Sequence, residues 1–289
     1  GVVGESVCGK STMGNTIIRL LEPDNGEIIF EGHDLAKMNR HELRKYRADI
    51  QMIFQDPFSS LDPRMHVFDI IAEPLRVHHT VSGKELEDRV LNLMEVVGLD
   101  ASYAQRYPHE FSGGQRQRIG IARALALQPK LVICDEPVSA LDVSIQAQIL
   151  NLLEELKEKM QLTYIFIAHG LPSVKYISDR IAVMYLGRIV ELADTKELFA
   201  HPLHPYTQGL LQAIPIPDPN LRKSDAERAI MGGDIPNAMK PPEGCYFHPR
   251  CPYATADCCN ESVGGPPILT EVRPGHFVSC FHAKEFAEK

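Results

Sequence analysis

The fold of this chain is decided by one stretch near its start, Gly4-Glu5-Ser6-Val7-Cys8-Gly9-Lys10-Ser11-Thr12. It matches G-x-x-x-x-G-K-[ST], the P-loop pattern of nucleotide-binding proteins. Its glycines let the backbone form a concave turn whose N–H groups face phosphate oxygens. Lys10 would bring a positive charge to the β- and γ-phosphates, and the Ser11 hydroxyl would ligate Mg²⁺. The next run, 13–21, is predicted to be a helix whose N-terminus faces the same anion.

Only Gly1, Val2 and Val3 precede this motif, where a P-loop fold places a whole strand. We therefore expect the chain to be truncated at its N-terminus and some of the nucleotide site to be missing. Because glycine-rich turns are common, the alternative interpretation is a tight strand-to-helix turn whose lysine faces solvent. The motifs downstream decide between the two.

Length and composition narrow the class of protein. The 289 residues allow one large α/β domain with an extension, or two domains, and 44% hydrophobic residues support a packed core. No apolar run approaches the roughly 20 residues of a membrane span. The net charge of -8 argues against a protein that mainly binds nucleic-acid backbone.

The order of predicted elements indicates an α/β fold. We expect a P-loop ATPase core with a parallel sheet, an antiparallel β edge, an inserted α-helical subdomain and a small cysteine-rich C-terminal extension. The apolar runs 131–134 and 163–168 are typical of buried parallel strands, and 67–99 has helical periodicity. The expected domains are a first segment of the ATPase core (residues 1–66), the helical subdomain (67–125), a second segment of the core (126–200) and the extension (201–289).

Polar side chains end both buried strands. Asp135 suits a water-bridged contact to Mg²⁺, and Glu136 suits the general base that orients an attacking water. A solvated strand end is the alternative. His169 ends the second strand and could hydrogen-bond a γ-phosphate, whereas a lone histidine there is more often structural.

A further motif, Ser112-Gly113-Gly114-Gln115, opens a predicted helix at 116–126. Small residues at a helix start expose N–H groups to an anion. On its own, this run is equally consistent with a plain helix-entry turn.

Taken together, the motifs follow the order found in the ATP-binding-cassette (ABC) family: the P-loop, Gln55, Ser112 to Gln115, Asp135-Glu136, Ser139-Ala140-Leu141-Asp142 and His169. Residues 1 to about 200 strongly resemble that family. The resemblance implies that two subunits sandwich two ATP molecules head to tail. Each site would take the P-loop, Gln55, Glu136 and His169 from one subunit and residues 112–115 from the other. Ser11, Gln55 and Asp135 would hold Mg²⁺, and Asp142 would cross the dimer interface.

Longer stretches resemble one branch of this family, the oligopeptide/dipeptide importers, and most closely its second (F-type) ATP-binding subunit. These stretches are 51–65, 135–150 (DEPVSALDVSIQAQIL) and His204-Pro205-Tyr206-Thr207. The resemblance implies an ATPase that powers peptide uptake from the cytoplasmic face of the bacterial inner membrane. Its partners would be a second ABC ATPase, identical or different, transmembrane permeases docked on 67–107, and through them a solute-binding protein.

Three other functions are weighed against this one. Within the same branch, the cargo could be nickel or another small solute. A soluble ABC ATPase acting on nucleic acid would need coiled-coil insertions or tandem cassettes, and the sequence has neither. A regulator that binds ATP without turnover is disfavoured by Glu136.

Two positions depart from the family pattern. Val7 stands where the family usually has glycine, and a β-branched residue restricts φ and ψ there. Gly170 follows His169 where the family usually has aspartate, and Pro172 comes two residues later. The aromatic residue expected to stack on adenine upstream of the P-loop is absent, so we expect weak ATP affinity, contradicted by a titration giving a micromolar or tighter Kd.

Five of the seven cysteines crowd the extension, and four have the spacing C-x5-C-x6-C-x21-C: Cys245, Cys251, Cys258 and Cys280. Four thiolates suit a [4Fe–4S] cluster or Zn²⁺, and the lack of a C-x2-C pair disfavours an ordinary zinc finger. The importer branch has a similar tail, linked there to an iron–sulfur cluster. Free reduced cysteines are the remaining alternative, and Cys259 is expected to be a spectator.

Overall fold

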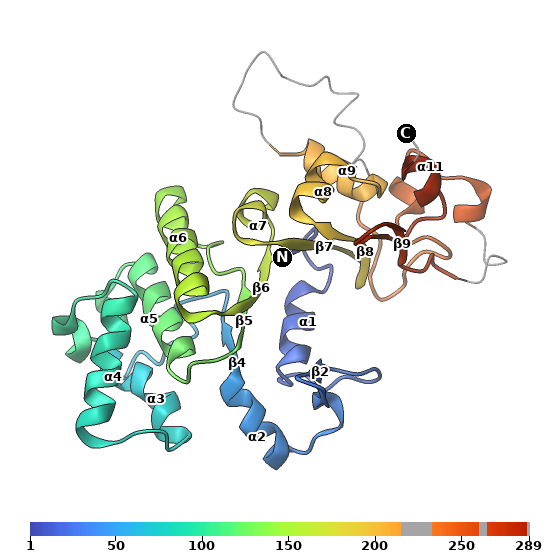
Figure 1. The fold of residues 1–289 in the computed structure, drawn as a ribbon. Coiled ribbons are helices and arrows are strands. Elements are labelled where there is room, and N and C mark those ends of the chain that lie inside the picture. Colours follow the sequence, from blue (N-terminus) through green and yellow to red (C-terminus); the bar gives the residue numbers. More distant parts are fainter. Residues whose placement is uncertain (215–232, 260–264, 288–289) are drawn as a thin grey trace. The chain divides into compact units, whose positions relative to one another are not determined.

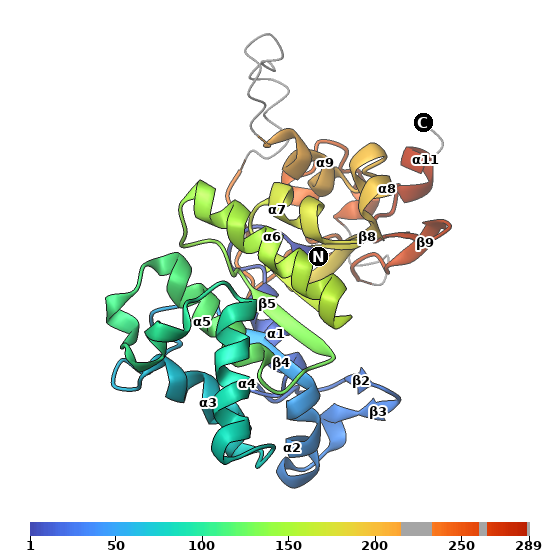
Figure 2. The same ribbon diagram turned by 60° about the vertical axis from the view of Figure 1, so that its left-hand side comes forward.

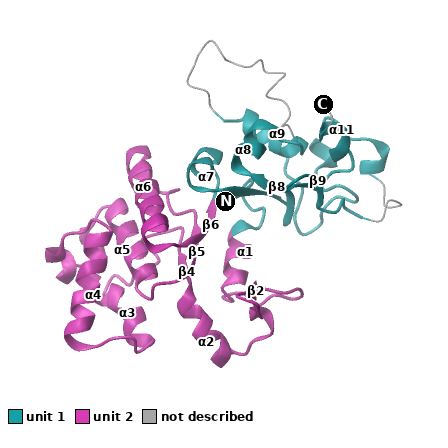
Figure 3. Cartoon of the chain, in the orientation of Figure 1, with its two compact units in different colours: residues 1–10, 168–289 teal, residues 11–167 magenta. Residues whose placement is uncertain are grey.

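The computed structural model describes residues 1–214, 233–259 and 265–287 (Figure 1). The chain divides into two compact units, residues 11–167 and residues 1–10 with 168–289 (Figure 3). The proline-rich run 215–219, expected from the sequence to be a linker, lies outside the described residues.

A parallel sheet forms the core of the unit 11–167. Its strands lie in the order β4 (Ile50–Ile53), β5 (Leu131–Asp135) and β6 (Thr163–Ala168). All but the first residue of β5 are buried, because apolar side chains face both sides of the strand. The carboxyl ends of β4 and β5 lie at the same edge, which places the residues that follow these two strands close together.

Helices of the same unit cover this sheet or form the insertion between β4 and β5. In α3 the residues Val67, Ile70, Ile71 and Leu75 are buried, the spacing of one helix face. This helix packs on α4 and α5, and the three helices lie side by side in Figure 2. The α-helices and short strands of the unit outside its core sheet are α1 (Lys10–Ile17), β2 (Ile29–Phe30), β3 (His33–Asp34), α2 (Arg40–Asp49), α3 (Val67–Val77), α4 (Gly83–Val96), α5 (Gly113–Leu125) and α6 (Val143–Met160). Its 3₁₀ helices are η1 (Leu35–Lys37), η2 (Ala101–Gln105) and η3 (Pro108–Glu110).

The other unit is built on a mixed sheet. Strand β1 (Val2–Val3) pairs in parallel with β7 (Arg180–Tyr185), which forms an antiparallel hairpin with β8 (Arg188–Asp194). Strand β10 (His276–Val278) pairs with β8 and with β9 (Thr270–Arg273). Strands β9 and β10 belong to the C-terminal region (residues 201–289), and they extend the edge of this sheet. In the described part of this unit, the helices are α7 (Leu171–Ile177), α8 (Thr195–Ala200), α9 (Pro205–Gln212), the 3₁₀ helices η6 (His248–Arg250) and η7 (Ala256–Cys258), and α11 (Ala283–Ala287).

A buried carboxylate fastens the C-terminal region to β8. Glu191 is fully buried, and it accepts hydrogen bonds from the backbone N–H groups of Leu203 at 2.7 Å and His204 at 3.1 Å. His276 Nε2 lies 2.8 Å from the same carboxylate. Burial lowers the pKa of His204 to about 4. Burial also opposes the charged form of His276, but the carboxylates of Glu191 and Glu197 outweigh it and raise the pKa of this histidine.

The predicted fold class is confirmed: an α/β arrangement with parallel strands, antiparallel edge strands and a helical insertion. The predicted strands at 131–134 and 163–168 are present, and the hairpin of β7 and β8 provides the antiparallel edge. Within the described ranges, no helix combines the length and apolarity that crossing a membrane demands.

Candidate functional site

The first turn of the P-loop lies in the unit formed by residues 1–10 and 168–289. A Cβ atom on Gly4 would lie 2.2 Å from the carbonyl oxygen of Met184, so only glycine fits against this strand. Gly9 has a φ of +100°, which glycine adopts without steric cost. Gly187 N–H donates to the Cys8 carbonyl oxygen at 2.8 Å, which holds the end of the loop against the β7–β8 turn.

Lys10 folds back into the turn that precedes it. The residue is 4% exposed, and Nζ donates to the carbonyl oxygens of Gly4 at 2.8 Å and Glu5 at 3.0 Å. A buried ammonium needs hydrogen-bond partners, and these carbonyls provide them. Burial raises the pKa of the neighbouring Cys8 thiol, although Lys10 partly offsets the effect. The positive charge predicted for phosphate binding is therefore held inside the loop.

Val7 has a backbone conformation that suits glycine. Its φ is 65°, in the left-handed region, and the residue is 89% exposed. A β-branched residue in this region is strained, at a cost of about 1–2 kcal/mol. The departure from the family pattern noted in the sequence therefore falls where the backbone favours glycine.

In the unit 11–167, two residues predicted to hold Mg²⁺ are in direct contact. The hydroxyl of Ser11, in the first turn of α1, donates to Oδ1 of Asp135 at 2.9 Å. Asp135 is the last residue of β5 and is buried. A hydroxyl and a carboxylate side by side are hard oxygen donors of the kind that Mg²⁺ accepts.

Gln55 and Glu136 are brought together in the same unit. Gln55 Nε2 donates to Glu136 Oε2 at 2.8 Å, although 81 residues separate them in the chain. Glu136 is 4% exposed, and its backbone N–H donates to the Ile167 carbonyl oxygen at 2.9 Å. Its φ of 47° places a non-glycine residue in the left-handed region. Strained conformations of this kind cluster at functional sites.

The run Ser112 to Gln115 begins helix α5. The Ser112 hydroxyl accepts from the Gln115 N–H, and the Gln115 side chain accepts from the Ser112 N–H, which makes a capping box. Ser112 is exposed, and a Cβ on Gly114 would lie 2.5 Å from Cγ2 of Ile145. Because Ser112 is its N-cap, the helix starts at Gly113, three residues before the predicted start. Asp142 is exposed at the N-terminus of α6.

His169 lies in the other unit, exposed, directly after β6. Gly170 is the N-cap of α7 and makes no side-chain capping bond. Pro172 stands in the first turn of this helix, where proline is tolerated because the N–H it lacks has no partner within the helix. Gly170 and Pro172 thus leave α7 intact.

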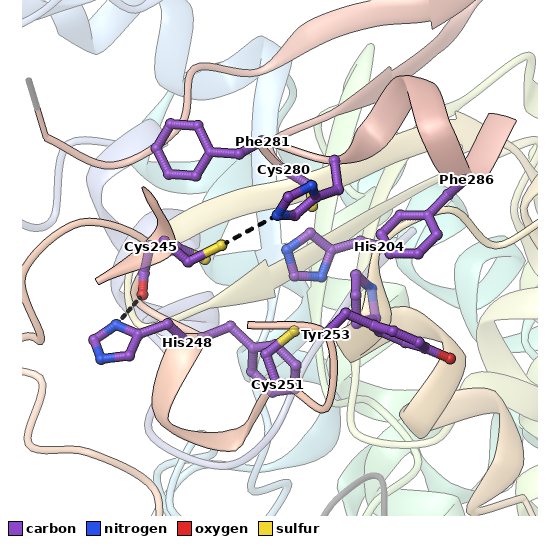
Figure 4. A pocket seen from close by; sticks show the side chains of 12 residues that line it. His204, Cys245, His248, Cys251, Tyr253, Cys280, Phe281 and Phe286 are labelled. Atoms are coloured by element: carbon purple, nitrogen blue, oxygen red, sulfur yellow. Dashed lines mark hydrogen bonds between the residues drawn. The ribbon is translucent and has the colours of Figure 1, made fainter. Parts of the chain in front are cut away.

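Four of the five cysteines of the C-terminal region line one pocket: Cys245, Cys251, Cys258 and Cys280. Figure 4 labels three of them, Cys245, Cys251 and Cys280. Apolar walls come from Phe247, Phe281 and Phe286. Burial raises the pKa of Cys245 to about 11 and that of Cys280 to about 12, so these thiols are protonated at neutral pH.

The cysteines are close together without forming a coordination sphere. Among residues 1–214, 233–259 and 265–287, no three His, Cys, Asp or Glu side chains are arranged to hold a metal ion. His282 Nε2 lies 3.6 Å from Cys258 Sγ, whereas Cys259 is exposed. Cysteine thiolates are nevertheless the donor type that an iron–sulfur cluster uses, and these four side chains share one pocket.

One contact in the P-loop has no counterpart among the sequence motifs. Arg250 forms an ion pair with Glu5 at 2.7 Å, across 245 positions of the chain. The Tyr206 hydroxyl accepts from the Glu5 N–H at 2.8 Å. The sequence marks Tyr206 only as a member of the run 204–207. Nothing local to Arg250 marks it, because the pairing arises from the tertiary fold.

Comparison with known proteins agrees with this geometry. The ABC transporter family pattern matches residues 1–139, and the pattern named "Oligopeptide/dipeptide transporter, C-terminal region" matches residues 190–258. The chain is 53% identical to the oligopeptide transport ATP-binding protein AppF of Bacillus subtilis, over 97% of this chain and 84% of that protein. It is 54% identical to the oligopeptide transport ATP-binding protein OppF of Salmonella typhimurium, over 97% and 82%.

A solved structure shares the fold. The dimeric post-hydrolysis state of the ATP-binding cassette MJ0796, bound to ADP and Pi, aligns with a TM-score of 0.61 and 31% identity over 67% of this chain and 84% of that one. From this likeness, and from the relatives that match nearly the whole chain, it follows that the protein belongs to the ABC transporter ATPases of the oligopeptide/dipeptide importer type.

Proposed function

We propose that this chain binds and hydrolyses Mg²⁺-ATP to power the uptake of di- and oligopeptides through a membrane transporter. The observation that carries the chemistry is the pair of side-chain contacts at the ends of β4 and β5: Ser11 with Asp135, and Gln55 with Glu136. The proposal that the cargo is a peptide rests on sequence identity with relatives named as oligopeptide transport ATP-binding proteins.

In the proposed reaction, Glu136 is the general base. Its carboxylate is buried and oriented by the Gln55 amide, so it would accept a proton from the attacking water while that water meets the γ-phosphorus. The bond from the γ-phosphorus to the β–γ bridging oxygen then breaks, and ADP leaves with phosphate. His169 would hydrogen-bond the γ-phosphate.

The phosphates would be held by the residues of the P-loop: Gly4, Glu5, Ser6, Cys8, Gly9, Lys10, Ser11 and Thr12. Mg²⁺ would be held by Ser11, Gln55 and Asp135, where it would neutralise charge on the β- and γ-oxygens. Lys10 would leave its carbonyl partners for the phosphates, an exchange of weaker acceptors for charged ones.

A second ATPase subunit would complete each site. The start of α5 carries Ser112, Gly113, Gly114 and Gln115, and the N–H groups of this first turn would face the ATP held by the partner. Asp142 would lie at the same interface. The dimeric state of the aligned cassette supports this arrangement.

The complete transporter would place this subunit at the cytoplasmic face of the inner membrane, with permeases docked on the helical insertion and a solute-binding protein delivering peptide. We further propose that Cys245, Cys251, Cys258 and Cys280 hold a [4Fe–4S] cluster, with Zn²⁺ as the alternative. The support for it is their shared pocket and their spacing. The group would stabilise the C-terminal region rather than take part in hydrolysis.

Reconstitution tests the function directly. The chain is assembled with its permeases and partner ATPase in lipid vesicles, and uptake of a labelled tripeptide is measured with ATP, without ATP and with Lys10→Ala. We expect ATP-dependent uptake of the peptide that Lys10→Ala abolishes. ATP-driven uptake of nickel without uptake of peptide would assign the chain to the alternative cargo.

A further inference from the structure

The carboxylate of Glu5, inside the P-loop, is gripped by a residue of the C-terminal region. Arg250 Nη1 donates to Oε2 at 2.7 Å, and Nη2 donates to Oε1 at 3.0 Å. Two parallel bonds from a guanidinium to a carboxylate fix orientation as well as distance. The side chains of Arg250 and Glu5 are 3% and 21% exposed. The pair is therefore screened less by solvent than a surface ion pair.

The backbone of Glu5 is held by a second residue outside the nucleotide-binding motifs. Its N–H donates to the hydroxyl of Tyr206 at 2.8 Å. Tyr206 is fully buried in α9, and its ring centroid lies 4.7 Å from that of Tyr185 and 5.4 Å from that of Phe247. Both the backbone and the side chain of Glu5 thus depend on residues that belong to none of those motifs.

The guanidinium of Arg250 packs against two aromatic rings. Its guanidinium carbon lies 5.9 Å from the ring centroid of Tyr185 and 5.8 Å from that of Phe247. Its backbone N–H donates to the Phe247 carbonyl oxygen at 3.0 Å, which closes the 3₁₀ turn η6. An arginine packed against aromatic rings loses little further entropy when it forms a bidentate bond.

Because Lys10 is bonded to the backbone of this turn, the contacts that hold Glu5 also affect the position of the Lys10 ammonium. The ammonium of Lys10 is bonded to the carbonyl oxygens of Gly4 and Glu5, so the path of this turn decides where the ammonium starts. The Glu5 carboxylate would also repel a triphosphate if its charge were not balanced. We propose that Arg250 is a positioning residue for ATP, which neutralises Glu5 and holds the first turn of the P-loop in the shape that accepts phosphates. The inference rests on ATP binding at the P-loop.

The test compares Arg250→Gln, Arg250→Lys and the double variant Glu5→Gln/Arg250→Gln in the assembled transporter. We expect Arg250→Gln to raise the KM for ATP about 10-fold, while kcat changes less than about twofold. Arg250→Lys should have an intermediate KM, because it keeps the charge and loses the fork. The double variant should recover some of the affinity, since no unbalanced carboxylate remains, and high salt should reduce the effect of Arg250→Gln.

Arg273→Gln is the matched control, because Arg273 belongs to the same C-terminal region and pairs with Glu197 at 3.2 Å. A KM unchanged by Arg250→Gln, or raised equally by Arg273→Gln, would overturn the assignment. A double variant that binds ATP no better than Arg250→Gln would overturn the claim that Arg250 acts by neutralising Glu5. If the wild-type chain binds no ATP, or if Lys10→Ala leaves binding intact, the proposed function fails, and the assignment of Arg250 fails with it.

Discussion

Replacing Val7 by glycine should stabilise the folded chain. Val7 has a φ of 65° and is 89% exposed, so its side chain buries little apolar surface to offset the strain. The left-handed conformation costs a non-glycine residue about 1–2 kcal/mol. Glycine adds about 0.4–1 kcal/mol of conformational entropy to the unfolded chain, which opposes folding. The difference makes Val7→Gly more stable by roughly 0.5–1 kcal/mol.

Urea unfolding of the purified chain measures this difference. With an m-value of about 2 kcal/mol/M, the midpoint should rise by about 0.2–0.5 M while m is unchanged. Val143→Gly is the matched control, since Val143 is 81% exposed at the first residue of α6, with no positive φ. Glycine in a helix should lower the midpoint there. A Val7→Gly midpoint at or below that of the wild type would refute the reasoning.

The remaining predictions concern packing, pH and metal. Gly114→Ala should destabilise the unit by about 1–3 kcal/mol in the same unfolding assay, because the new Cβ would lie 2.5 Å from Ile145; an unchanged midpoint would contradict this. The pKa of His276 is raised in the folded chain. The stabilisation by protonated His276 is therefore complete below its unfolded pKa of about 6.5, and it is lost as the pH rises through the folded pKa. The difference in unfolding free energy between wild type and His276→Gln should therefore shrink as pH rises, and a constant difference would count against the Glu191 contact. Anaerobically purified protein should contain about four irons and four sulfides per chain; one zinc without sulfide would select the alternative, and neither metal would remove the proposal.

The strands and the helical insertion could be predicted because their signals are local. The run Leu131–Asp135 is apolar on both faces, and the 3.6-residue spacing of Val67, Ile70 and Ile71 continues along α3. The start predicted for α5, at Arg116, lies three residues too late. The capping box of Ser112 and Gln115 extends the helix over two glycines, which propensity alone disfavours.

The features of the site that could not be predicted depend on the tertiary fold. For Gln55 and Glu136 the sequence predicts only a joint role, because their contact arises where two parallel strands end at one edge. The positive φ of Glu136 could not be predicted from its residue type, because glutamate rarely adopts that conformation. Arg250 reaches Glu5 over 245 positions and carries no motif.

The central claim is that Glu136 is the base of an ATPase, and a single substitution tests it most directly. Glu136→Gln keeps the size of the side chain and removes the proton acceptor. Its hydrolysis rate and its Kd for Mg²⁺-ATP are measured in the assembled transporter, with Glu155→Gln, an exposed glutamate of α6, as the control. We predict a loss of about 100-fold or more in kcat with ATP affinity retained. Hydrolysis at the wild-type rate by Glu136→Gln would contradict the account.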